Sequence, residues 1–166
     1  MKRLIAFFIS VITVLSLAAC SDNQVSDKKA AADGTEVSSA LPVINAEQIK
    51  DGEYEIEVES SSSMFRIVKC VLTVAEGKMT AAMTMSGQGY GALFMGKMGD
   101  APASPDDTCI SFETDADGAK VFTVPVEVLN KSIDCAAWSI RKESWYDREL
   151  IFKSDMIPSE CISANN

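Results

Sequence analysis

The feature that most restricts the fold of this chain is a set of short segments in which apolar and polar residues alternate. Between 53 and 59, tyrosine, isoleucine and valine alternate with four glutamates. A period of two residues is typical of a half-buried antiparallel strand and not of a helix. The segments 67–74 and 78–85 repeat the pattern on either side of Glu76-Gly77, and this arrangement predicts a β-hairpin.

Further alternating segments follow along the chain. The segments 108–114 and 120–128 predict a second hairpin, and 133–140 and 145–152 predict two more strands. About seven short strands with regular turn signals predict an all-β fold, and we expect an immunoglobulin-like antiparallel β-sandwich, with a small closed barrel as the alternative. Pro125 interrupts its segment, which indicates an edge strand or a bulge.

The longest break in the pattern, 86–107, is rich in glycine and proline. Within it, the stretch Tyr90 to Met98 is too apolar to remain a free loop, so we expect it to dock as one or two helical turns. Loops of this length in compact domains are often functional or disordered.

The N-terminus has the pattern of a secretory signal. A basic start at Lys2 and Arg3 precedes an apolar stretch that ends in Ala18-Ala19-Cys20. These last residues resemble a bacterial lipobox, and the resemblance implies cleavage before Cys20 and a lipid on its thiol. We therefore divide the chain into a signal peptide at 1–19, a lipid-anchored flexible linker at 20–44, a β-sandwich domain at 45–158 and a tail at 159–166.

The charge balance restricts the possible partners. The net charge is −9, and removal of the signal lowers the number of basic residues from 15 to 13 and that of acidic residues not at all. The mature chain then carries about −11 and has no long-range attraction to nucleic acid or to anionic lipid. We expect the lipid on Cys20 to hold the protein at the extracytoplasmic face of the cell membrane.

Four cysteines remain after Cys20, and an even number in an exported chain favours disulfides. Three pairings are possible. Cys70 and Cys135 both lie in strand patterns, and Cys109 and Cys161 both lie near polar segments, so we favour Cys70–Cys135 and Cys109–Cys161. No CxxC spacing occurs, which argues against a redox enzyme or a zinc knuckle.

The chain contains no histidine. This absence removes the Ser-His and Cys-His nucleophile arrangements as well as the commonest metal ligand. We therefore expect a protein that is not an enzyme and has no metal site. A Cu(I) site is a lesser alternative, because thioethers suit soft copper and four methionines lie in 83–98: Met83, Met85, Met95 and Met98.

The order of these segments resembles that of NEAT domains, the immunoglobulin-like modules that bind haem at Gram-positive cell surfaces. The resemblance covers about residues 51–153, and the matching residues are Asp51-Gly-x-Tyr-x-Ile, Ser62-Ser63-Met64, Val74-x-x-Gly77-Lys78, Val124-Pro-Val-Glu-Val-Leu129, Tyr146-Asp147 and Leu150-Ile-Phe152.

In that family, a tyrosine at the start of the last strand ligates the haem iron and a Ser/Met lip covers the other face. The resemblance implies that Tyr146 is this ligand. The family has a second tyrosine four residues further on, and this chain has Leu150 at that position. We expect a ligand pocket between Ser62, Ser63, Met64 and Phe65 on one side and Trp145 and Tyr146 on the other. The expected function is capture of haem or an iron-containing ligand for uptake, together with a transporter component. The alternative is an interaction module that recognises another envelope protein and binds no small molecule.

Overall fold

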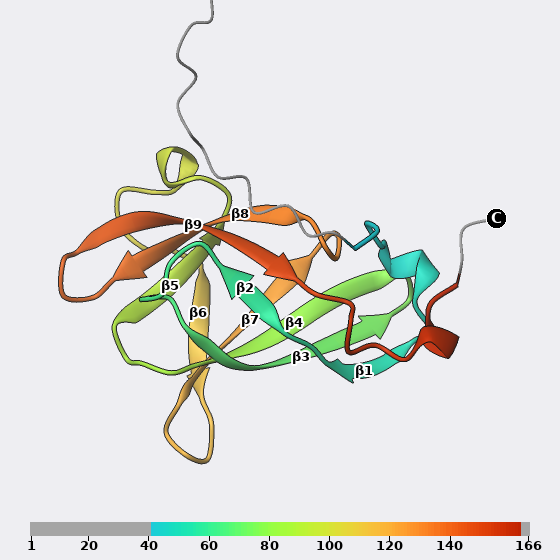
Figure 1. The fold of residues 1–166 in the computed structure, drawn as a ribbon. Coiled ribbons are helices and arrows are strands. Elements are labelled where there is room, and N and C mark those ends of the chain that lie inside the picture. The colour runs from blue at the N-terminus through green and yellow to red at the C-terminus, as the bar shows by residue number, and fades with distance from the viewer. Residues whose placement is uncertain (1–40, 164–166) are drawn as a thin grey trace, which may run out of the picture. The chain divides into compact units, whose positions relative to one another are not determined.

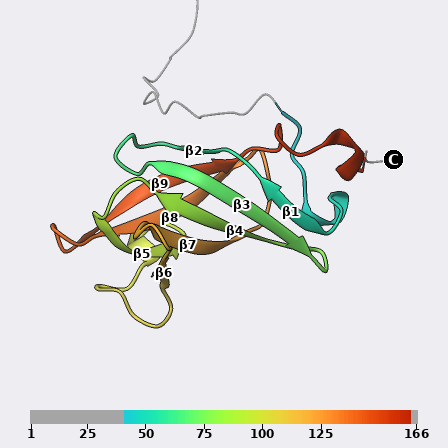
Figure 2. The same ribbon diagram turned by 90° about the horizontal axis from the view of Figure 1, so that it is seen from below.

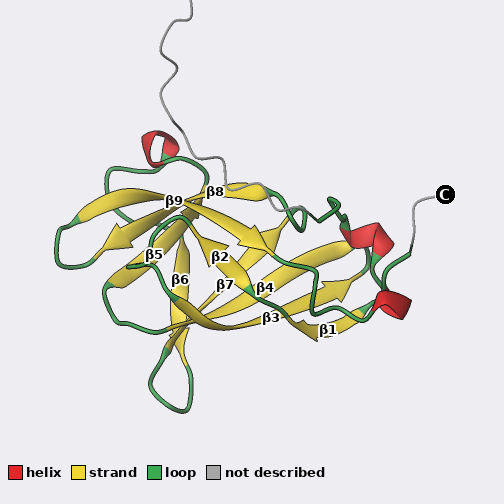
Figure 3. Ribbon diagram, viewed as in Figure 1, coloured by secondary structure: helices red, strands yellow, loops and turns green. Residues whose placement is uncertain are grey.

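The computed structural model describes residues 41–163, which belong to one compact unit made of strands and three 3₁₀ turns. The strands are β1 (Gly52–Glu55), β2 (Val58–Ser60), β3 (Ile67–Ala75), β4 (Lys78–Met85), β5 (Tyr90–Met95), β6 (Ile110–Thr114), β7 (Lys120–Val126), β8 (Ser132–Ser139) and β9 (Ser144–Phe152). The 3₁₀ turns are η1 (Ala46–Gln48), η2 (Met98–Asp100) and η3 (Ser159–Cys161). Figure 3 shows how strands dominate the described part of the chain.

The nine strands form a single antiparallel sheet in the order β1-β3-β4-β7-β6-β5-β8-β9-β2 (Figure 1). Four of the pairings join neighbours in the sequence: β3 with β4, β5 with β6, β6 with β7, and β8 with β9. The all-β prediction is confirmed.

The two edge strands, β1 and β2, are consecutive parts of one extended segment. β1 pairs with β3 and β2 pairs with β9, so this segment touches both edges of the sheet. Between them, the Ile56 N–H donates to the Cys70 carbonyl at 3.1 Å, and the Glu57 carbonyl accepts from the Lys153 N–H at 2.9 Å. The sheet is therefore curled: β1 lies beside β3 at one edge, and β2 lies beside β9 at the other (Figure 2).

Curling gives the sheet an inner and an outer face with separate apolar clusters. The inner face holds the main core, to which every strand supplies at least one side chain; its fully buried large members are Phe65, Leu72, Val74, Met83, Leu93, Phe122, Val124, Leu129, Leu150 and Phe152. The smaller outer cluster consists of Ala92, Ala136 and Trp145, with Phe94 and Trp138 against it.

The structure has nine strands where about seven were predicted: the segment 53–59 forms two strands, β1 and β2, and a stretch expected to be helical forms another. Tyr90–Met95 is a strand, β5, and not a pair of helical turns. Leu93 belongs to the inner core and Ala92 to the outer cluster. Because both faces of β5 are covered, its sequence is continuously apolar, and such a short stretch cannot be assigned from periodicity.

The folded part extends beyond the predicted 45–158 domain at both ends. Ile44 bridges to Leu129, and Ile162 bridges to Ile49, which brings η3 beside η1 (Figure 1). Ile44 ends the short apolar stretch that begins at Leu41, and Ile162 lies in a polar tail; neither belongs to an alternating segment that would predict its contact. The signal peptide, Cys20 and most of the predicted linker lie outside the described residues.

Pro125 lies in β7, which is an interior strand of the sheet. The partner β6 pairs only with Lys120, Val121 and Phe122, so the half of β7 that contains Pro125 has β4 on one side and no strand on the other. The missing N–H of Pro125 is tolerated at this locally free edge.

One buried side chain links the start of the folded unit to the segment that follows β9. Asn130 has a positive φ of 62°, and its Nδ2 donates to the Pro42 carbonyl at 2.6 Å and to Ser154 Oγ at 2.8 Å. Its Oδ1 accepts from the Ser154 N–H at 3.0 Å.

We expect Asn130→Ala to lower the free energy of unfolding by about 2–4 kcal/mol, since buried polar partners lose their bonds and alanine is strained at positive φ. Asn130→Gly loses the same bonds but avoids the backbone strain. Its free energy of unfolding should therefore be about 1 kcal/mol higher than that of Asn130→Ala. Urea denaturation checks both values. Equal stability of wild type and Asn130→Ala would contradict this role.

Candidate functional site

The predicted lip forms the turn between β2 and β3. The Phe65 N–H donates to the Ser62 carbonyl at 3.0 Å and closes a turn that includes Ser63. Met64 is 79% exposed, whereas Phe65 is fully buried and packs edge-on against Tyr90, with ring centroids 5.1 Å apart. Phe65 is therefore part of the core below the lip, and Met64 is the lip residue that a ligand can reach.

The structure separates Trp145 from Tyr146. These neighbours on β9 point to opposite faces of the sheet, as alternation along a strand requires. Trp145 is 6% exposed in the outer cluster, where its Nε1 donates to the Pro102 carbonyl at 2.7 Å and its ring packs on Trp138. Trp145 is thus a structural residue of the outer face and does not share a pocket with the lip.

Tyr146 shares the inner-face alternation of β9 with Arg148, Leu150 and Phe152. It is 38% exposed near the end of the sheet where the lip lies, because β2 pairs with β9 and the Ser61 N–H donates to the Glu149 carbonyl at 2.9 Å. The structure therefore brings Tyr146 and the lip to one end of the inner face, and it places Trp145 on the outer face.

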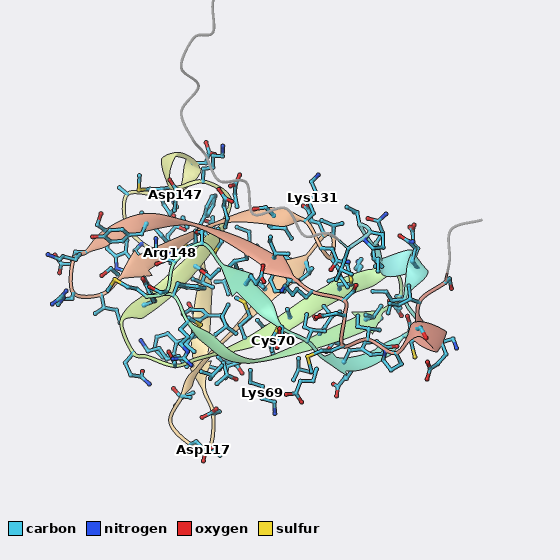
Figure 4. All side chains as sticks on the ribbon, in the orientation of Figure 1. Lys69, Cys70, Asp117, Lys131, Asp147 and Arg148 are labelled. Carbon is cyan, nitrogen blue, oxygen red and sulfur yellow. The ribbon has the colours of Figure 1, made fainter. Side chains whose placement is uncertain are left out.

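Between Tyr146 and the lip lies Arg148, which the sequence analysis did not identify. Its guanidinium carbon lies 5.4 Å from the Tyr146 ring centroid and 5.7 Å from that of Tyr90. Its Nη2 donates to the Tyr90 hydroxyl at 2.8 Å and its Nη1 to the Asp147 carbonyl at 2.6 Å. Asp147 itself points to the outer face, where its Oδ1 accepts from the Met98 N–H at 2.6 Å (Figure 4).

Within residues 41–163, Arg148 forms no ion pair, although Asp134, Asp147 and Glu149 line a hollow with it. The two ion pairs among residues 41–163 are Lys97–Asp134 and Lys153–Glu59, and Arg148 Nε is buried without a hydrogen-bond acceptor. A half-buried cation without a counter-ion costs free energy that an ion pair would offset. A sequence signal existed: Arg148 is a charged residue on the apolar face of a strand that continues with Leu150 and Phe152.

A pocket of about 230 Å³ opens beside this group, between three connections that meet at the same end of the sheet. The β2–β3 turn, the β4–β5 loop and the β8–β9 turn supply most of its wall. It is lined by Met64, Arg66, Met85, Gly87, Gly89, Tyr90, Ser139 and Arg141. Tyr90 lines this pocket and accepts a hydrogen bond from Arg148, whereas Arg148 itself lines a neighbouring hollow with Asp134, Asp147 and Glu149.

The four cysteines among the described residues are free thiols, so neither predicted disulfide is formed in the structure. Cys109 packs against the outer cluster, whereas Cys161 packs against the main core beside η1. Because the two residues lie in different clusters, their similar polar neighbours in the sequence did not indicate a Cys109–Cys161 disulfide. Burial raises the pKa of both the Cys70 and the Cys135 thiol to about 12, although the charge of Arg148 opposes the shift at Cys135.

The methionines proposed for copper do not converge. Met83 and Met85 are buried in the inner core from β4, whereas Met98 is exposed in η2, beside β8 and β9. Packing accounts for the first two. In the stretch 41–163, none of the helices has the length and apolar character needed to cross a membrane.

A scan of protein-family models and a search of curated proteins found no match to this chain. The likeness to NEAT domains therefore remains a prediction from the motifs.

The thiols provide a direct test of this arrangement. In residues 21–166 under native, non-reducing conditions, we expect a thiol reagent to modify Cys109 and Cys161 quickly. Cys70 and Cys135 should react only after unfolding, because burial hinders access and thiolate formation. Mass spectrometry before and after denaturation checks the order. Complete absence of reactive thiols in the unfolded, unreduced protein would contradict the structure and restore the predicted disulfides.

A comparison with the buried cation Lys120 tests whether Arg148 is needed for stability. Lys120 Nζ donates to the carbonyls of Gln88 at 3.1 Å and Tyr90 at 2.7 Å and lies 4.0 Å from the Phe112 ring centroid. Its hydrogen-bonding capacity is used within the fold, and burial lowers its pKa.

We expect Lys120→Met to lower the free energy of unfolding by about 2 kcal/mol, since two carbonyls lose their donor. Arg148→Met should change it by less than about 1 kcal/mol, because removal of an unpaired half-buried charge offsets the loss of its hydrogen bonds to the Tyr90 hydroxyl and the Asp147 carbonyl. Guanidinium denaturation measures both variants. A loss at Arg148→Met as large as at Lys120→Met would make Arg148 a structural residue.

Proposed function

We propose that this protein is an extracytoplasmic binding module, held at the cell membrane by a lipid on Cys20, which captures a small ligand at the end of the inner face. The observation that carries the proposal is the Tyr90–Arg148–Tyr146 group beneath an exposed lip, with a half-buried guanidinium that has no counter-ion. Groups of this kind cost stability and are retained where a ligand uses them.

Haem, or a related flat iron-containing ligand passed on to a transporter component, is the ligand that we propose first. Tyrosine oxygen can serve as an axial haem ligand, and Tyr146 is accessible on the same face and end as the lip. The thioethers of Met64 and Met85 and the Tyr90 ring supply apolar cover. A pocket of about 230 Å³ is small, so such a ligand would remain partly exposed.

We also propose that the curled sheet corresponds to an immunoglobulin-like sandwich. Its support is the division into a half that contains β1, β3, β4 and β7 and a half that contains β5, β8, β9 and β2, with β6 pairing to both. The main core takes side chains from both halves.

The alternative is an interaction module of the cell envelope. The large apolar side chains at this end are exposed, with Met64 at 79%, Ile140 at 49% and Tyr146 at 38%. Exposed apolar residues in a polar rim are typical of a protein contact. In that case the same end of the sheet binds a partner protein and no small molecule.

A haem titration of residues 21–166, followed by absorbance, tests the first proposal. We expect a saturable Soret shift that Tyr146→Phe weakens at least tenfold, because the ring stays and the ligating oxygen is lost. Tyr54→Phe is the matched control, since Tyr54 lies on β1, its hydroxyl donates to the Lys50 carbonyl and it takes no part in the site. No saturable shift, or the same loss in both variants, would remove haem and favour the interaction module.

A further inference from the structure

The pocket at the lip has a charge opposite to that of the protein around it. Arg66 follows the lip and Arg141 belongs to the β8–β9 turn, and both line the pocket. Neither forms an ion pair among residues 41–163, where the two ion pairs use lysines. No acidic residue lines the pocket, although the whole chain has 24 acidic residues and a net charge of −9.

Arg148 sets the polarity of a third group in this pocket. Its Nη2 donates to the Tyr90 hydroxyl oxygen at 2.8 Å. A phenol that accepts one hydrogen bond still has its own hydrogen to donate. Tyr90 lines the pocket together with Arg66 and Arg141. Arg66, Arg141 and Tyr90 thus offer hydrogen-bond donors and positive charge to the same space.

The remaining wall is largely apolar or small. Met85 is buried at the base of the pocket, Met64 covers it from the lip, and Phe65 supports the Tyr90 ring from below. Thioethers adapt to ligands of irregular shape. A site of about 230 Å³ lined in this way fits a small amphipathic molecule, or the charged end of a larger one.

We propose that this pocket selects its ligand by charge: it binds an amphipathic anion whose carboxylate or sulfonate is held by Arg66, Arg141 and the Tyr90 hydroxyl and whose apolar part lies on Met85 and Met64. The inference rests on the proposed binding function and names the class of ligand. Guanidinium groups suit this task because they pair with planar oxyanions through two parallel hydrogen bonds.

Two fluorescent probes with the same ring system test the charge preference. 1-Anilinonaphthalene-8-sulfonate has a sulfonate, and N-phenyl-1-naphthylamine is its neutral counterpart. With residues 21–166, we expect saturable binding of the sulfonate at least tenfold tighter than that of the neutral probe, and weaker binding at high salt because ions screen the exposed arginines.

Variants locate the binding. Arg66→Gln, Arg141→Gln and Tyr90→Phe should each weaken sulfonate binding severalfold and leave the affinity for the neutral probe within twofold. Lys131→Gln removes the same charge away from Arg148 (Figure 4) and should have no effect. Cooperative urea unfolding of every variant shows that the probe does not report a partly unfolded state.

The outcomes separate this inference from the proposed function. Equal affinity for the two probes, or equal losses in Arg66→Gln and Lys131→Gln, would overturn the charge selection and leave a pocket without charge preference. Absence of saturable sulfonate binding would also overturn the inference, while the haem titration decides independently whether the site binds a ligand.

Discussion

The double attachment of the segment 52–60 determines the form of this fold. Its first part pairs with β3 and its last part with β9, so one stretch of chain holds the two edges of a nine-strand sheet. Curling follows, and with it a closed apolar interior that one face of a flat sheet would not provide. The same geometry leads the chain from β2 directly into the lip, so the site depends on the constraint that closes the fold.

At the lip end, the inner face changes from apolar to polar within one strand. Along β9, Phe152 and Leu150 are fully buried, Arg148 is half-buried, and Tyr146 is accessible. Arg148 is held by hydrogen bonds and ring contacts and not by a carboxylate, so its charge is not neutralised within the described chain. The apolar core is thus followed, at the lip end of β9, by a half-buried guanidinium that forms no ion pair among the described residues.

The sequence predicted those parts of the fold that period-two alternation determines. Both hairpins and the last two strands lie where the pattern placed them, and buried residues alternate most clearly in β3, β4 and β7. It did not predict β5, whose two faces are both covered, or the end contacts of Ile44 and Ile162. For the proposed site, the sequence grouped Trp145 and Tyr146 with the lip, and the structure separates Trp145 because adjacent residues on a strand point to opposite faces. Tyr90 and Arg148 come close to each other only because β5 and β9 both pair with β8, which the sequence pattern does not reveal.

Chemical-shift mapping tests the central claim, that ligand binds at the lip end of the inner face, most directly. Amide spectra of residues 21–166 are recorded with and without gallium protoporphyrin, a diamagnetic haem analogue, and with and without 1-anilinonaphthalene-8-sulfonate. The account predicts that shifts concentrate in 62–66, 86–91 and 139–148 and spare η1, η3 and the Glu76-Gly77 turn. Shifts centred on the outer cluster or on the η1–η3 end, or no shifts with either compound, would contradict it.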